Sequence, residues 1–262
     1  MINARDIRVT FGKKPILYGV DFTARPGEVT AIVGPNGSGK TTLLRALTDE
    51  VRWTGQISVN HRDIRIYKPW ELAAIRAVLP QAATLAFPFT VIEVVRLGLM
   101  SGIHGGKDRI AQYALQQVGL AGYENRFFQE LSGGEQQRAH LARVLCQVWD
   151  PVIDGVPRWL LLDEPVASLD IGHQLLIMNC VQNFARRGGG VVAVMHDLNL
   201  TAMVADAVTM IARGEAIAQG PVAEVFTDHR LSAAYQCELK TNAVPPNASA
   251  FILPQTAALR GH

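Results

Sequence analysis

The sequence predicts an α/β fold with a mainly parallel sheet, an antiparallel strand layer at the N-terminal end and an inserted helical region. Three observations predict it. Apolar and polar residues alternate over the first 30 positions, the continuous apolar runs 159–162 and 191–195 are each followed by a polar residue, and helical periodicity fills most of the stretch from about Glu71 to Leu145. Alternation is typical of half-buried strands, and continuous apolar runs are typical of strands buried on both faces.

The N-terminal layer is predicted from two short segments separated by turn signals. Residues 7–11 alternate before Gly12, and residues 17–22 carry spaced apolar side chains before the turn signal Arg25-Pro26-Gly27. Glycine and proline of this kind mark the ends of strands. The two segments therefore predict an antiparallel edge layer.

The first core strand is predicted at residues 30–33, where β-branched residues dominate. A glycine-rich loop follows, and residues 41–47 then carry leucines at helical spacing. The order is strand, loop, helix. Between 71 and 145 helical periodicity prevails and strands are hard to find, which predicts an all-helical lobe inserted into the core.

Composition limits the function classes. The chain has 262 residues, 48% apolar and 18% charged, which is ordinary globular composition. With 25 basic and 23 acidic residues there is no charge footprint for nucleic acid. The three cysteines have no CxxC spacing, so a zinc site and a disulfide framework are disfavoured and a reducing compartment is expected. Without a signal-peptide core or an 18-residue apolar run, any membrane contact is expected to be peripheral.

A phosphate-binding loop is the strongest motif. The segment between the first core strand and its helix matches G-x-x-x-x-G-K-[ST]. Its glycines let backbone amides face phosphates, while the lysine reaches the β- and γ-phosphates and the threonine hydroxyl reaches Mg²⁺. The nucleotide-binding residues predicted here are Gly34, Pro35, Asn36, Gly37, Ser38, Gly39, Lys40, Thr41 and Thr42.

Two carboxylates follow the apolar run 159–162. Asp163 and Glu164 stand at the C-terminal end of a predicted strand, the edge at which open α/β sheets place ligands. Asp163 is predicted to hold Mg²⁺, directly or through water, and Glu164 to polarise an attacking water. Adjacent acids also occur at solvated strand ends, but the nearby phosphate loop favours nucleotide hydrolysis.

A second glycine pair opens a predicted helix at residues 131–138, Leu-Ser-Gly-Gly-Glu-Gln-Gln-Arg. Ser132 with Glu135 fits a capping box, in which the serine is merely the helix cap. Gly133 and Gly134 are poor helix formers, which suggests that backbone there approaches another group closely. We expect Ser132, Gly133 and Gly134 to form a second anion site, and we count Glu135 with them among the nucleotide-binding residues.

In this order the segments resemble the ATP-binding-cassette (ABC) ATPases over roughly residues 1–226, the glycine pair matching that family's signature motif. The resemblance implies a P-loop NTPase with a RecA-like core, an antiparallel β subdomain and a helical subdomain, binding ATP and Mg²⁺. It also implies that Phe11 stacks on adenine, that Gln81 contacts Mg²⁺, that Asp170 lies in a loop crossing between subunits, and that His196 is a catalytic γ-phosphate switch. Taken alone, His196 would be a strand-end histidine.

The family pattern predicts one ABC ATPase domain over 1–262. Residues 1–80 and 146–240 form the nucleotide-binding core, about 81–145 the helical subdomain and 241–262 a tail that packs or dangles. Two departures from the pattern are visible. Val166 stands where the family usually has threonine, and residues 149–158 form an extra stretch marked by proline and glycine, which predicts a surface loop.

The resemblance also implies partners. In the family, the P-loop of one chain and the signature segment of another sandwich ATP in a head-to-tail homodimer. A chain without a membrane span of its own is then expected to drive two transmembrane permease subunits from the cytoplasmic face of the bacterial inner membrane, served indirectly by a periplasmic substrate-binding protein. Nucleic acid is not expected as a partner.

The cargo is suggested by local likeness. Residues 85–91 (LAFPFTV), 134–143 (GEQQRAHLAR) and 196–200 (HDLNL) resemble importer ATPases for metal chelates, especially haem (hemin) importers. Iron-siderophore and vitamin B12 importers are the alternatives within that class. The apolar residues 87–89 also fit a simple core role; in the family this region forms the groove for a permease helix.

Two functions of other classes fit the sequence less well. A soluble ABC ATPase of DNA repair carries a long coiled-coil arm, but Gln81 and Ser132 are only 51 positions apart, and a translation-type member carries two cassettes. A P-loop kinase needs an acceptor site and a lid, and gains nothing from residues 131–138.

Overall fold

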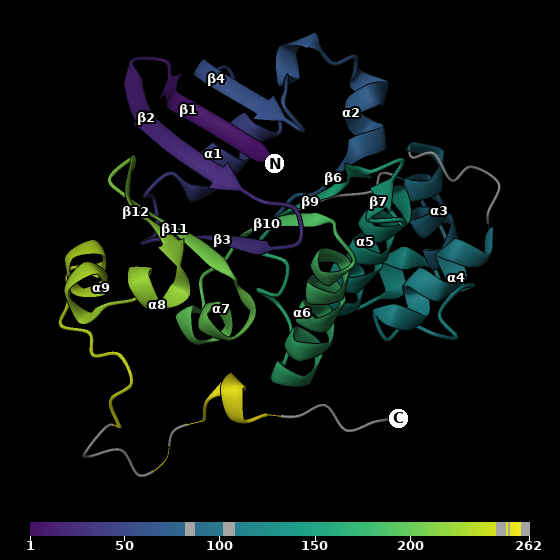
Figure 1. The fold of residues 1–262 in the computed structure, drawn as a ribbon. Coiled ribbons are helices and arrows are strands. Elements are labelled where there is room, and N and C mark those ends of the chain that lie inside the picture. Colours follow the sequence, from purple (N-terminus) through teal and green to yellow (C-terminus); the bar gives the residue numbers. More distant parts are fainter. Residues whose placement is uncertain (82–86, 102–107, 245–249, 251, 258–262) are drawn as a thin grey trace.

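The computed structural model describes residues 1–81, 87–101, 108–244, 250 and 252–257. It is an α/β structure, and the predicted fold class is confirmed. Figure 1 shows the smaller sheet on one side of the larger sheet, α6 and α7 on the other side, and α3, α4 and α5 together at one end. Leu85 and Ala86 of the cargo-related stretch, together with part of the tail, lie outside the described residues.

The larger sheet carries the functional edge. Among the described residues, six strands form it in the order β12-β11-β3-β10-β9-β6. All neighbours are parallel except β11 and β12. The strands are β3 (Val29–Val33), β6 (Arg76–Leu79), β9 (Trp159–Asp163), β10 (Gly190–Val194), β11 (Ala207–Ala212) and β12 (Glu215–Pro221). Every residue of β3, β9 and β10 is buried, as expected for parallel strands covered on both faces.

The smaller sheet confirms the predicted antiparallel layer. In the described part of the chain its order is β2-β1-β4-β5. Its strands are β1 (Ile2–Phe11), β2 (Lys14–Ala24), β4 (Thr54–Val59) and β5 (Arg62–Asp63). Helix α1 (Lys40–Leu47) contributes Leu43, Leu44 and Leu47 to a buried cluster shared with both sheets. This packing fixes the start of α1 against the larger sheet.

The helical region contains one strand that the sequence did not predict. Strand β6 pairs in parallel with β9 and extends the larger sheet. It lies within the stretch where an all-helical lobe was expected, and its four residues follow directly on helix α2. The helices and 3₁₀ turns here are η1 (Ile64–Ile66), α2 (Pro69–Ile75), α3 (Val91–Ser101), α4 (Asp108–Gln117), η2 (Phe128–Glu130) and α5 (Gly133–Gln147). The domain boundaries at 80 and 145 stay a prediction, since one buried cluster spans both regions.

The beginning of α3 is joined to the turn before α5. Thr90 and Phe127 form an isolated antiparallel bridge, and the Phe128 amide donates to the Phe89 carbonyl at 2.9 Å. The Gln129 side chain donates to the Phe87 carbonyl at 2.6 Å. Further along, the two helices approach closely, because a Cβ built on Gly98 would stand 1.9 Å from the Arg143 carbonyl oxygen. The two helices therefore meet backbone against backbone.

The extra stretch 149–158 is a hairpin, so the prediction of a plain surface loop was wrong in part. Strands β7 (Val152–Ile153) and β8 (Val156–Pro157) pair in antiparallel fashion. Asp154 and Gly155 between them both have positive φ, 51° and 74°, which is the geometry of a tight two-residue hairpin turn.

Two helices of the C-terminal third, α6 (Ile171–Arg186) and α7 (Leu198–Val204), cover the other face of the larger sheet. The remaining helical elements of this third are α8 (Val222–Val225), α9 (Asp228–Tyr235) and η3 (Pro254–Thr256). The described part of the tail is mostly exposed, and it is attached to the rest of the chain by hydrogen bonds at two places. Thr241 donates twice to Asp228 Oδ1, at 2.7 Å from both its amide and its hydroxyl, and Gln255 donates to the Asn199 carbonyl on α7. Within the described ranges, no helix is long and apolar enough to span a bilayer.

Candidate active site

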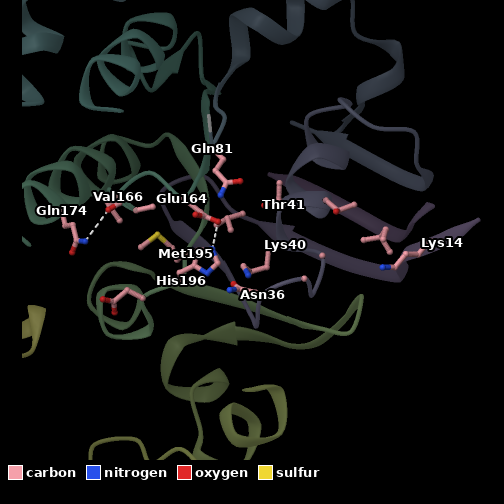
Figure 2. A pocket seen from close by; sticks show the side chains of 17 residues that line it. Lys14, Asn36, Lys40, Thr41, Gln81, Glu164, Val166, Gln174, Met195 and His196 are labelled. Atoms are coloured by element: carbon pink, nitrogen blue, oxygen red, sulfur yellow. Dashed lines mark hydrogen bonds and ion pairs between the residues drawn. The ribbon is translucent and has the colours of Figure 1, made fainter. Parts of the chain in front are cut away.

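A cavity of about 930 Å³ opens at the C-terminal edge of β3, β9 and β10 (Figure 2). These strands are neighbours in the larger sheet, so the loops that follow them converge. The described residues that line the cavity are Lys14, Ile16, Asn36, Gly37, Gly39, Lys40, Thr41, Thr42, Gln81, Glu164, Val166, Ala167, Gln174, Val194, Met195, His196 and Asp197. The cavity therefore gathers predicted residues from four separate segments.

The loop after β3 has the backbone that its glycines allow. Gly34 has φ +149°, and a Cβ there would stand 1.9 Å from the Ile211 carbonyl oxygen. Gly39 has φ +106° and directly precedes α1. Glycine is needed where the chain turns this tightly against another strand. The loop therefore turns directly into the N-terminus of α1, where backbone amides favour an anion.

Lys40 lies inside this loop. Its ammonium donates to the carbonyls of Gly34 at 2.9 Å and Pro35 at 3.1 Å, and the residue is only 5% exposed. Burial lowers the pKa of Lys40, while the carboxylates of Glu164 and Asp163 oppose that shift. A buried cation held only by neutral carbonyls and nearby acids is suited to binding phosphate oxygens.

Thr41 and Asp163 place two oxygen ligands side by side. The Thr41 hydroxyl donates to Asp163 Oδ1 at 3.2 Å. Burial raises the pKa of the Asp163 carboxyl, and the bond from Thr41 opposes the shift. A hydroxyl and a carboxylate are the hard oxygen donors that Mg²⁺ prefers, and Mg²⁺ is usually bound by one or two such groups together with phosphate. The donor set therefore fits that ion.

Glu164 and His196 form the closest polar pair in the cavity. Val194 of β10 lies opposite Asp163 of β9, so the residues that follow the two strands meet. His196 Nε2 lies 2.5 Å from Glu164 Oε1 (Figure 2). Glu164 has φ +53°, a left-handed conformation that is uncommon for residues other than glycine and that turns its side chain toward the histidine. The Glu164 amide donates to the Val194 carbonyl at 3.2 Å and holds this turn.

The structure brings only part of the predicted site together. Asn36, Gly37, Gly39, Lys40, Thr41, Thr42, Gln81, Glu164 and His196 line the cavity. Asp163 does not line the cavity itself and is joined to it through its hydrogen bond with Thr41. Gly34, Pro35 and Ser38 belong to the P-loop but are not among the described residues that line the cavity. Phe11 is 49% exposed and is not among the described residues that line the cavity; its strand partner Lys14 is.

The signature residues lie outside the cavity. Ser132 caps α5, and its amide and hydroxyl both donate to Glu135 Oε2 at 2.8 Å, so the capping box is present. The bond from the Ser132 amide lowers the pKa of Glu135. Asp170 caps α6. Of the residues described, neither these two caps nor Gly133 and Gly134 contribute to the lining.

Some lining residues escaped sequence reasoning. Lys14, Gln174 and Asp197 reach the cavity from β2, α6 and the cap of α7. No local motif marks Lys14 or Gln174. Asp197 directly follows His196 and precedes an apolar-periodic segment, which is an N-cap signal.

Residues 17–167, more than half of the chain, match the family model described as ABC transporter. The chain belongs to the ABC transporter family. The resemblance drawn from the motifs is thereby confirmed. The family model ends shortly after Glu164 and includes the P-loop, Gln81 and the signature segment.

Full-length relatives agree with this assignment. The chain is 58% identical to the hemin import ATP-binding protein HmuV of Jannaschia sp. (strain CCS1), covering 100% of this chain and 97% of that protein. It is 58% identical to the protein of the same name from Roseobacter denitrificans, with 98% of each chain covered. The one from Mesorhizobium japonicum is 56% identical, with 98% of this chain and 99% of that protein covered.

Solved structures share the fold. An ATP-binding cassette of an ABC transporter is 25% identical with a TM-score of 0.77, covering 90% of this chain and 98% of that one. A bacterial ABC transporter cassette solved as a dimer is 25% identical with a TM-score of 0.74, covering 85% of this chain and 99% of that one.

Proposed function

We propose that this chain is the ATP-binding and ATP-hydrolysing subunit of a bacterial importer of hemin. The observation that carries the hydrolytic part is the cavity in which Lys40, Thr41, Glu164 and His196 converge. In this proposal Lys40 and the amides of the P-loop hold the phosphates. Glu164 accepts a proton from the attacking water, and His196 contacts the γ-phosphate.

Mg²⁺ would be held by Thr41, Asp163 and Gln81 together with the nucleotide phosphates. When bound it supplies Lewis-acid polarisation of the phosphate oxygens. Thr41 and Asp163 are already in contact, so they need little rearrangement to share an ion. Gln81, which follows β6, reaches the cavity from the helical side.

The proposed assembly is a head-to-tail homodimer. Support comes from the position of Ser132, Gly133 and Gly134, which lie outside their own chain's cavity, together with Glu135 and Asp170. A second copy would bring this set to the nucleotide, and Phe11 would stack on the adenine. ATP would then close the dimer by shifting it toward a conformation that is stable only with ATP bound.

The proposed load is a pair of transmembrane permease subunits in the bacterial inner membrane, with this chain at the cytoplasmic face and a periplasmic binding protein acting indirectly. Phe87 is 68% exposed, whereas Phe89 packs against the buried core, so Phe87 is the better candidate for a permease contact. No nucleic acid partner is proposed.

Hemin as cargo is supported by relatives that are 52–58% identical over almost their whole length and carry that name. The test is growth of a strain that lacks this gene. Growth on hemin as sole iron source should fail, and growth on ferric siderophores should persist. Equal loss of both would refute hemin as the specific cargo, and unimpaired growth on hemin would refute a role in hemin import. Restoration by the wild-type gene, but not by the Lys40→Ala variant, is the matched control.

A further inference from the structure

The loop that follows β9 runs from Glu164, the proposed base, to a contact with Gly134 of the signature segment in the same chain. We refer to residues 164–170 as the base loop. It begins at Glu164 and contains two turn hydrogen bonds, from the Ala167 amide to the Glu164 carbonyl at 3.3 Å and from the Leu169 amide to the Val166 carbonyl at 3.2 Å. At its C-terminal end the base loop contacts Gly134 of the signature segment. A Cβ on Gly134 would lie 3.2 Å from Leu169 Cδ2 and 3.3 Å from the Ser168 carbonyl oxygen.

Gln174 holds this loop from the first turn of α6. Its side-chain Nε2 donates to the Leu169 carbonyl at 3.1 Å. It also makes a longer contact, 3.5 Å, with the Val166 carbonyl, which Figure 2 shows as a dashed line. These carbonyls stand at the two ends of the Val166–Leu169 turn. The same side chain lines the cavity. Gln174 therefore fastens the base loop at the wall of the nucleotide site.

His173 secures the end of the same loop. Its amide donates to Asp170 Oδ1 at 2.9 Å, and its ring Nδ1 lies 2.8 Å from Asp170 Oδ2. The first of these bonds is the ordinary cap of α6. His173 holds the side chain of Asp170, and Gln174 holds the backbone of the base loop. Both the backbone and the last side chain of the loop are therefore attached to α6.

We propose that Gln174 is a positioning residue for ATP hydrolysis, which holds the base loop so that Glu164 presents its carboxylate to the attacking water. This inference rests on the proposed function of Glu164. Gln174 would act through the loop and not on the reacting atoms.

The contacts predict which kinetic constant depends on Gln174. The phosphates are expected at the P-loop, where Lys40 donates to the Gly34 and Pro35 carbonyls, and α6 takes no part in these two bonds. Glu164 belongs to the base loop itself. Loss of the Gln174 amide should therefore lower kcat and leave the KM for ATP unchanged, because the catalytic group shifts while the binding groups do not.

The test compares Gln174→Leu with Gln182→Leu. Gln182 is a matched control, since it lies on the same helix and also donates from its side-chain amide to a backbone carbonyl, that of Val204 at 3.2 Å, away from the cavity. For Gln174→Leu, kcat should fall about 3- to 10-fold, the loss expected for one uncharged hydrogen bond, with KM within about twofold of wild type. Gln182→Leu should change neither constant. Gln174→Glu matches the shape but turns an acceptor toward carbonyl oxygens, and should lower kcat further.

The outcomes separate the alternatives. A wild-type kcat for Gln174→Leu would overturn the proposal. So would a higher KM at unchanged kcat, which would make Gln174 a binding residue. If both leucine variants lost kcat in proportion to a lower melting temperature, the role would be structural and the proposal wrong. Failure of the proposed function looks different, because either the wild-type protein would show no ATPase activity with Mg²⁺, or Glu164→Gln would hydrolyse ATP at the wild-type rate.

Discussion

Glu164→Gln separates the chemical step from nucleotide binding. The side chain of Glu164 is only 14% exposed, and its carboxylate meets His196 at 2.5 Å. The amide of glutamine has the same shape and can keep a hydrogen bond to the imidazole, so the cavity should retain its geometry. What disappears is the proton acceptor. A positioned base contributes about 10²- to 10⁴-fold, and we therefore expect kcat to fall by at least about 10²-fold, a rise of about 2.7 kcal/mol in the barrier.

The assay pairs phosphate release with size exclusion. ATP affinity should change little, because Lys40, Thr41 and Asp163 are untouched. Unhydrolysed ATP should then trap a closed homodimer of the Glu164→Gln variant, while wild type in ATP runs mainly as monomer. Thermal melts of both proteins without nucleotide should coincide within a few degrees, which controls for folding.

Two results would contradict these roles of Glu164 and the signature segment. Hydrolysis by Glu164→Gln at the wild-type rate would mean that another group, such as His196, is the base. An inactive variant that binds ATP but never dimerises would refute the role given to Ser132, Gly133 and Gly134 in the isolated subunit.

Four further predictions follow from single contacts. Lys40→Ala should abolish nucleotide binding in a fluorescent-ATP titration and give no ATP-dependent dimer. Gly34→Ala should do the same and also lower the melting temperature, because its Cβ would stand 1.9 Å from the Ile211 carbonyl oxygen. Asp163→Asn should abolish Mg²⁺-dependent hydrolysis yet raise the melting temperature at pH 7. Burial raises the pKa of Asp163, so the ionised carboxylate lowers the stability of the folded protein. The rise in melting temperature should therefore shrink as the pH falls through that raised pKa. Calorimetry at several pH values checks this, at roughly 2–4 °C per kcal/mol. Phe87→Asp should abolish hemin uptake in permease-containing vesicles while the basal ATPase rate and the melt stay at wild-type values, because Phe87 is 68% exposed; normal uptake would exclude Phe87 from the permease contact.

Sequence reasoning succeeded where the signal is local. The P-loop, the capping box of α5 and the buried strands β3, β9 and β10 each depend on neighbours within a few residues, and the structure contains them all. The Asp154-Gly155 turn was equally local: Asp-Gly between apolar pairs is a strong hairpin signal, so the hairpin of β7 and β8 was predictable and was missed.

The other features that the sequence did not predict depend on contacts between residues far apart in the chain. Strand β6 is only four residues long, and it is a strand because β9, some 80 positions later, pairs with it. Lys14 and Gln174 line the cavity because of how β2 and α6 pack, and nothing in their own neighbourhoods distinguishes them. Pairing and packing partners far away in the sequence decide such positions, and periodicity does not contain them.

The bridge between Thr90 and Phe127 has a mechanical consequence. From Phe87 to the start of α5, the connection consists of the bonds Gln129 to Phe87 and Phe128 to Phe89, followed by Gln136, whose side chain donates to the Leu131 carbonyl at 3.1 Å. A hydrogen bond weakens steeply when its distance or angle changes, so the groups that it joins tend to move together. A shift of the Phe87 backbone would therefore move the turn before α5, and a shift of Ser132 would act on Phe87 through the same bonds.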